Sequence, residues 1–149
     1  MTNLTRKKPR KFRRGEPASS LPCPSSASTT LYQGAAVELS SGLLQNATGA
    51  GTTFAGFLDE NATGDGTSDG TNVAKVVRKG EVLLTCAHAT TFALSDEGAA
   101  VYLTDGDTFT TVSTSAQQIG KISEIPPAAV GAASAQVWVT FEGKAERSI

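Results

Sequence analysis

Residues 135–142, Ala-Gln-Val-Trp-Val-Thr-Phe-Glu, carry the clearest strand signal in the chain. Val137, Val139 and Phe141 alternate with polar residues and with Trp138. This period of two predicts a β-strand with one face in a core and one mixed face. Because Trp138 lies on the mixed face, we expect it at an interface.

Upstream of this strand, short apolar segments separated by turn residues recur from residue 31 onward. Aromatic residues are few, and Gly, Ala, Ser and Thr are abundant, which favours short strands over long helices. We therefore predict an all-β fold, a small β-barrel or sandwich over residues 31–143, followed by a C-terminal tail over 144–149. The predicted strands are 31–39, 43–46, 52–58, 73–78, 80–86, 99–104, 109–113, 118–125 and 135–142.

Two local features within the predicted strands are specific. Asp105-Gly106 lies between two β-like segments and is typical of a hairpin turn. Ile119 and Ile122 are out of phase with strict alternation, and a bulge at Gly120 would place both side chains in the core.

Helical and loop signals are limited to short segments. Residues 91–98 and 128–134 are each long enough for about one helical turn. Residues 59–72 are rich in Asp, Gly, Thr and Asn and predict an exposed, mobile loop. When the calcium-loop pattern starts at Asp59, Gly70 occupies the position of the bidentate glutamate, so no metal site is expected.

The residues that usually carry chemistry form no catalytic motif. Cys86 shares a strand face with Val82 and Leu84, which indicates a small core residue, and Cys23 and Cys86 are expected as free thiols. The single histidine, His88, is expected as a surface or edge residue. We therefore expect no enzyme activity, no catalytic residue, no cofactor and no small-molecule substrate.

No segment approaches the roughly 20 apolar residues that cross a bilayer, and the basic start is not followed by the apolar part of a secretion signal. We therefore expect a protein that is made in the cytoplasm and does not contact a membrane.

The first fourteen residues carry seven of the chain's thirteen basic side chains and no acid, whereas residues 15–149 hold six basic and fourteen acidic residues, a charge of +7 against −8. A like-charged block with one aromatic residue cannot fold alone. With the Pro/Ser-rich spacer over 15–30, it predicts an extended, irregular arm over residues 1–30 that becomes ordered on a partner. The expected binding residues are Arg6, Lys7, Lys8, Arg10, Lys11, Phe12, Arg13 and Arg14, with Leu4, Leu21 and Trp138 as further interface residues.

An acidic protein surface is the expected partner of this arm. The acidic excess of the rest of the chain opposes approach to a polyanion, and Phe12 is the one aromatic side chain in the arm that could stack on a base. Direct contact with nucleic acid is therefore disfavoured.

Six segments follow one another along the chain, most of them a glycine turn beside a strand: 34–42 (Gly-Ala-Ala-Val-Glu-Leu-Ser-Ser-Gly), 54–57 (Phe-Ala-Gly-Phe), 77–82 (Val-Arg-Lys-Gly-Glu-Val), 97–103 (Glu-Gly-Ala-Ala-Val-Tyr-Leu), 119–124 (Ile-Gly-Lys-Ile-Ser-Glu) and 137–141 (Val-Trp-Val-Thr-Phe). In this order, the series resembles the small β-barrel capsid cement proteins, or head decoration proteins, of tailed bacteriophages. The resemblance extends over residues 34–142. Two features depart from that family: the basic arm is longer than usual, and residues 59–72 look inserted.

The resemblance implies a non-enzymatic virion protein that binds the outside of an icosahedral head and clamps neighbouring capsid subunits. The implied partners are the major capsid protein and further copies of the chain, since such proteins often form trimers. The implied location is the capsid exterior after synthesis in the host cytoplasm. Two alternatives stay open: another virion structural β module, at the tail or a vertex, and a nucleic-acid-binding protein that uses the basic arm.

Overall fold

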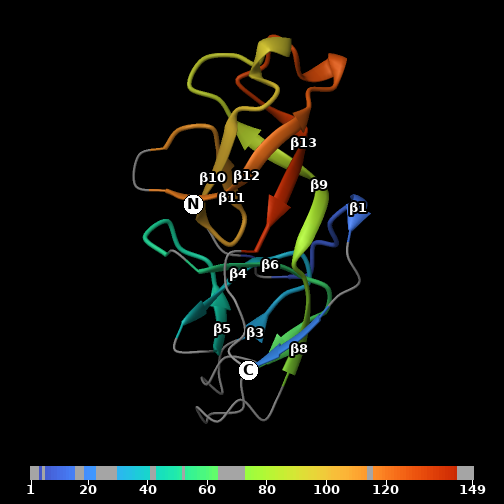
Figure 1. The fold of residues 1–149 in the computed structure, drawn as a ribbon, viewed down its shortest axis with the longest axis vertical. Coiled ribbons are helices and arrows are strands. Elements are labelled where there is room, and N and C mark those ends of the chain that lie inside the picture. The colour runs from blue at the N-terminus through green and yellow to red at the C-terminus, as the bar shows by residue number, and fades with distance from the viewer. Residues whose placement is uncertain are drawn as a thin grey trace.

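Nearly all the regular structure of the chain is β, as a computed structural model shows (Figure 1). It describes residues 4, 6–15, 19–22, 30–40, 43–51, 53–63, 73–113 and 116–143. The all-β prediction is confirmed. Two three-residue 3-10 turns, η1 (Leu94–Asp96) and η2 (Pro127–Ala129), fall in or beside the segments predicted to make single helical turns.

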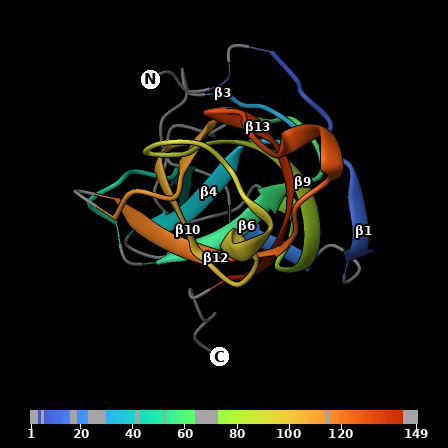
Figure 2. The ribbon, with the colours of Figure 1, turned by 90° about the horizontal axis from the view of Figure 1, so that it is seen from above.

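Five strands close into a barrel: β9 (Lys79–Ala87), β11 (Thr108–Thr110), β10 (Ala100–Asp105), β12 (Gln117–Glu124) and β13 (Ser134–Glu142). They are hydrogen-bonded in that order, and β13 pairs back onto β9 along the full length of both strands. Only the β9–β11 pair in this ring is parallel. The ring is visible from above in Figure 2.

The barrel contains both local features expected from the sequence. Asp105 pairs with Thr108 across the hairpin turn, and its carboxylate accepts hydrogen bonds from the Asp107 amide (2.9 Å) and the Thr108 hydroxyl (3.1 Å). Between β10 and β12, Val101 pairs with Gly120 but Tyr102 pairs with Gln118, so Ile119 is the extra residue of a bulge. Ile119 and Ile122 are both buried, as the bulge hypothesis required.

A second sheet of five antiparallel strands lies below the barrel in Figure 1. Its strands, in spatial order, are β2 (Ser19–Pro22), β8 (Val73–Val77), β6 (Phe54–Leu58), β4 (Ala36–Ser40) and β5 (Leu43–Asn46). Only Arg78 separates β8 from β9, so the chain passes directly from this sheet into the barrel. A short pair, β3 (Thr30–Leu31) with β7 (Ala62–Thr63), and β1 (Phe12–Gly15), which pairs with β9, complete the β structure.

Two predictions about local structure were wrong. The strand predicted over 31–39 is interrupted by a turn in which the Ala35 amide donates to Tyr32 O (3.0 Å), and Gly34 adopts a φ of 94° there. The predicted loop over 59–72 includes β7, where Ala62 is buried because it pairs with Leu31. Residues 64–72 lie outside the described residues.

The core joins the two sheets. One apolar cluster fills the barrel and includes Phe54 and Phe57 of β6, which contact Phe141 of β13 with ring centroids 6.4 and 4.9 Å apart. A second cluster lies within the second sheet, around Leu31 and Val37. Rings of β6 therefore close the lower end of the barrel.

A buried polar contact also links the sheets. The Glu38 carboxylate of β4 is 5% exposed and accepts from the Thr48 amide (2.7 Å) and from the Gln117 side chain of β12 (3.4 Å). The side-chain oxygen of Gln117, Oε1, in turn accepts a hydrogen bond from the Phe54 amide (2.8 Å). We call Glu38 and Gln117 the polar joint.

Candidate functional site: the N-terminal strap

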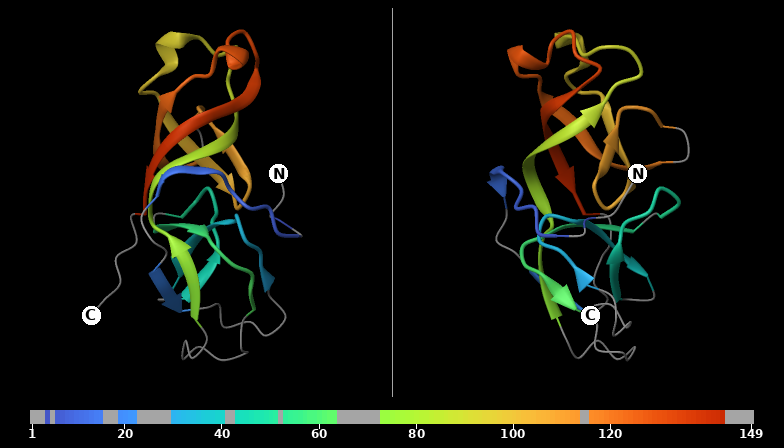
Figure 3. Two further views of the ribbon diagram at one scale, coloured as in Figure 1. Left: turned by 90° about the vertical axis from the view of Figure 1, so that its right-hand side faces the viewer. Right: turned by 180° about the vertical axis from the view of Figure 1, so that it is seen from behind.

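The basic segment crosses the molecule between the barrel and the second sheet, and we call its residues 6–15 the strap (Figure 3, left). Its backbone is hydrogen-bonded at two points before β1 begins. The Lys8 amide donates to Gln33 O (2.8 Å), and the Leu83 amide donates to Lys11 O (2.9 Å). A Cβ on Gly34 would lie 1.8 Å from Lys8 O, so the strap passes too close for any side chain at position 34.

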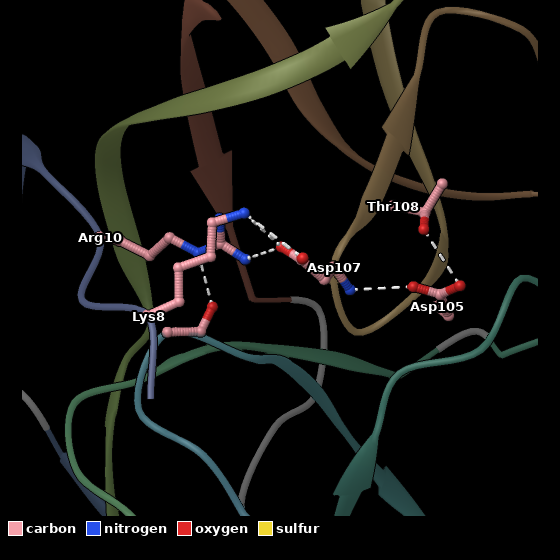
Figure 4. Close-up of polar contacts among 6 residues, drawn as sticks. Lys8, Arg10, Asp105, Asp107 and Thr108 are labelled. Carbon is pink, nitrogen blue, oxygen red and sulfur yellow. Dashed lines mark hydrogen bonds and ion pairs between the residues drawn. The ribbon is translucent and has the colours of Figure 1, made fainter. Parts of the chain in front are cut away.

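Arg10 is the most deeply placed cation of the strap. Its side chain is 5% exposed, its Nε donates to Gly34 O (2.6 Å), and its Nη2 donates to the Asp107 carboxylate (2.5 Å), as Figure 4 shows. The guanidinium carbon lies 5.8 and 5.4 Å from the ring centroids of Phe57 and Phe109. Arg10 therefore fixes the strap to the β10–β11 hairpin and to both sheets.

The hairpin turn holds the partner of Arg10 in place. The carboxylate of Asp105 accepts a hydrogen bond from the amide of Asp107. The Asp107 carboxylate points toward Lys8 and Arg10 of the strap (Figure 4). Lys8 Nζ lies 3.3 Å from the same Asp107 carboxylate, with its own side chain 50% exposed. One carboxylate thus binds two cations of the strap.

Phe12 anchors the strap in the aromatic core. Its ring centroid is 6.4 Å from that of Phe57 and 6.1 Å from that of Phe141, and it packs partly buried against the barrel cluster. Leu4, upstream of the strap, packs in the same way against the second-sheet cluster.

Arg13 is bound to acidic residues of the barrel. Its Nη2 donates to Glu81 (2.5 Å), its Nη1 donates to Glu124 (3.1 Å), and its guanidinium carbon lies 4.2 Å from the Trp138 ring centroid. The hydrogen bond to Glu81 is the main cause that raises the pKa of Arg13 above its ordinary value. The Ser123 hydroxyl donates to the same Glu81 oxygen (3.0 Å).

Three further cations of the strap face solvent. Arg6, Lys7 and Lys11 are exposed, and among the residues that the structure describes none of the three makes an ion pair or a side-chain hydrogen bond. The side chains of Arg14 and Leu21 lie outside the description, although their backbones belong to β1 and β2.

The structure adds contacts that the arm hypothesis did not include. We expected the basic block to become ordered on a partner, and in the structure Arg10, Phe12 and Arg13 contact the chain's own barrel. Trp138, expected at an interface, lies under Arg13. Sequence reasoning missed the acidic partners, Asp107, Glu81 and Glu124. The excess of acid after residue 15 was the available signal, but it does not identify which carboxylates meet the strap.

Cys86 and His88, the other residues considered for chemistry, both pack against neighbouring residues of the fold. Cys86 is buried, and burial raises its pKa to about 12, so the core prediction is confirmed. His88 directly follows the end of β9 and is half-buried, with its Nε2 3.2 Å from Asp96 Oδ1 and its ring packed on Phe92. Hydrogen bonds from the Ala93 amide and His88 lower the pKa of Asp96.

Within the described ranges, no three His, Cys, Asp or Glu side chains are grouped closely enough to hold a metal ion. In the same part of the chain, no helix has the length and apolar character needed to cross a membrane. No protein-family model matches the sequence, and no curated protein matches it either.

Proposed function

We propose that the chain is a capsid cement protein that binds the outer surface of an icosahedral phage head and stabilises contacts between capsid subunits. The observation that carries the proposal is the strap, which presents Arg6, Lys7 and Lys11 to solvent while Lys8, Arg10 and Arg13 bind carboxylates of the barrel. The resemblance of residues 34–142 to decoration proteins supplies the biological setting.

Clamping a shell requires binding and no chemical step. The partners in this proposal are the major capsid protein and further copies of the chain, and the location is the virion exterior. Exposed ion pairs each contribute about 0.2–1 kcal/mol, so a single copy would bind weakly through charge alone. A second contact in the same copy acts at an effective concentration in about the millimolar range, and many copies act on one shell.

The fixed strap favours this role over that of a free tail. Ordering a backbone costs about 1–2 kcal/mol per residue. In this chain, contacts such as that of Arg10 with Asp107 order the strap on the protein's own body. Binding to a shell would therefore not have to offset the entropy cost of ordering the strap, and more of the free energy of each new contact would contribute to affinity.

The test is binding to shells assembled from the major capsid protein encoded in the same genome. We expect the full chain to co-sediment with these shells, and an electron cryo-microscopy map to show it repeated over the outer surface in hundreds of copies. Copies restricted to one vertex or to the tail would instead identify another virion module. Absence from the particle would overturn the proposal.

A further inference from the structure

The strap has two chemically different sides, and we propose that its solvent side, formed by Arg6, Lys7 and Lys11, is a pre-ordered docking edge for an acidic protein surface. This inference rests on the proposed function, because it states which residues of the basic segment meet the capsid. We call these three residues the outward edge.

The inward cations are already bound within the chain. Arg10 is 5% exposed and bound to Asp107. Arg13 is bound to Glu81 and Glu124 and lies over the ring of Trp138. A partner that recruited Arg10 or Arg13 would have to break these ion pairs and leave carboxylates of low exposure without their cations. Glu81, for example, is only 6% exposed.

The outward edge has the opposite properties: its side chains are exposed and its backbone is held on both sides. Leu4 and the Lys8 amide fix the chain on either side of Arg6 and Lys7. The carbonyl of Lys11 is bound by the Leu83 amide. The three cations therefore extend from a segment that is already ordered, and a partner would not have to order it.

The size and surroundings of the edge favour a protein partner over nucleic acid. At no more than about 3.6 Å per residue, the Cα atoms of Lys7 and Lys11 are at most about 14 Å apart, which fits a patch of a few Asp and Glu side chains. The carboxylates of Asp107, Glu81 and Glu124 lie beside the strap. They would repel a long chain of phosphates that continued beyond the edge.

The experiment compares two matched double variants of the full chain. K7Q/K11Q removes two lysines of the outward edge, whereas K75Q/K121Q removes two exposed lysines of β8 and β12 and changes the net charge equally. We expect K7Q/K11Q to weaken binding to capsid shells about tenfold, as the loss of two exposed ion pairs would. K75Q/K121Q should bind within about twofold of the unmodified chain, and K7R/K11R should restore binding.

Each outcome separates the edge from the function. If the unmodified chain binds shells and both double variants weaken it equally, the outward edge is wrong while the cement function stands. If the unmodified chain does not bind shells at all, the proposed function fails first. If K7Q/K11Q binds shells normally but loses binding to a short DNA duplex at physiological salt, the edge recognises nucleic acid and the acidic-protein assignment is overturned.

The pre-ordering is tested separately by hydrogen exchange on the free protein. We expect the amides of Lys8 and Leu83, which bond to Gln33 O and Lys11 O, to exchange slowly before any shell is added. Fast exchange of both amides in the free protein, with protection only on shells, would mean that the segment is a leash that orders on its partner.

Discussion

The barrel and the second sheet both contain five strands, but they draw them from the chain in different ways. All five barrel strands lie within residues 79–142, and β13 closes the ring onto β9. The second sheet takes one edge strand, β2, from the N-terminal region, beyond the strap. The hydrogen-bonded closure of the barrel is therefore independent of the arm, whereas the second sheet is completed by it.

The strongest way to break this comparison is to delete residues 1–22, which removes β1, β2 and the anchors Arg10, Phe12 and Arg13. We expect the free energy of unfolding to fall by roughly 3–5 kcal/mol, because the packed Phe12 ring and the part-buried ion pair of Arg10 with Asp107 are lost together. Hydrogen exchange should show reduced protection in β8, which loses β2 as one of its two partner strands, and retained protection in the β9–β13 ladder. Equal loss in both would show that the barrel also depends on the arm.

A matched pair of glycine variants tests each sheet in turn. A Cβ at Gly56 would lie 2.1 Å from Val77 O in the second sheet, and one at Gly120 would lie 2.0 Å from Thr140 O in the barrel. We expect each alanine variant to lose on the order of 2–4 kcal/mol, with Gly56→Ala the larger because its φ is +137°.

The thiol of Cys86 reports which sheet has opened in these variants. Because its pKa is raised to about 12, it should not react at neutral pH while the barrel is closed. With Cys23→Ser as background, Gly120→Ala should speed thiol labelling of Cys86 more than Gly56→Ala does. Faster labelling of Cys86 in Gly56→Ala than in Gly120→Ala would show that the barrel opens first at its contact with β6.

The polar joint is the next test, since it couples the two sheets. Gln117→Ala would leave the Phe54 amide without its acceptor, Gln117 Oε1, and the Glu38 carboxylate without the hydrogen bond that Gln117 Nε2 donates. We expect a loss of about 1–3 kcal/mol in denaturant unfolding. Gln118→Ala, at the half-exposed neighbouring position, is the control and should change stability by less than about 0.5 kcal/mol.

The smallest expected effect is a local loss of stability in acid around Asp96, which lies in η1 beside the barrel. Because the folded-state pKa of Asp96 is lowered, its contribution is present above the unfolded-state value of about 3.9 and is lost as the pH falls through the folded-state value. Below about pH 4, we expect the backbone amides of residues 88–96 to lose protection from hydrogen exchange. The Asp96→Asn variant should show no such change with pH. An unchanged pH response in the variant would assign the acid effect to other groups.

Sequence patterns predicted β13, which alternates, and missed β1 and β7, which do not. The clear case is β13, where Val137, Val139 and Phe141 alternate and are all buried. By contrast, β1 is Phe-Arg-Arg-Gly and β7 has two residues, so neither has a period to detect. They form strands because distant segments, β9 and β3, present free edges to them.

The candidate site was predictable only in part. The charge block identified the cations of the strap, but not their division into two sides. That division depends on carboxylates far away in sequence: Arg10 binds Asp107, and Arg13 binds Glu81 and Glu124. Asp105-Gly106-Asp107 was correctly assigned to a turn, yet a local turn signal contains no information about which cation the turn will face.

The closure of the barrel by β13 also sets the order of events during synthesis. Residues 6–15 leave the ribosome well before β13, so the Trp138 ring and the β9–β13 ladder are not available to them until residues 134–142 are translated. At about 5–20 residues per second, this interval is on the order of ten seconds. For that time Lys8, Arg10 and Arg13, which bind carboxylates in the structure, lack part of their native contacts while they are close to ribosomal RNA. The strap is thus translated before the barrel strands that hold it.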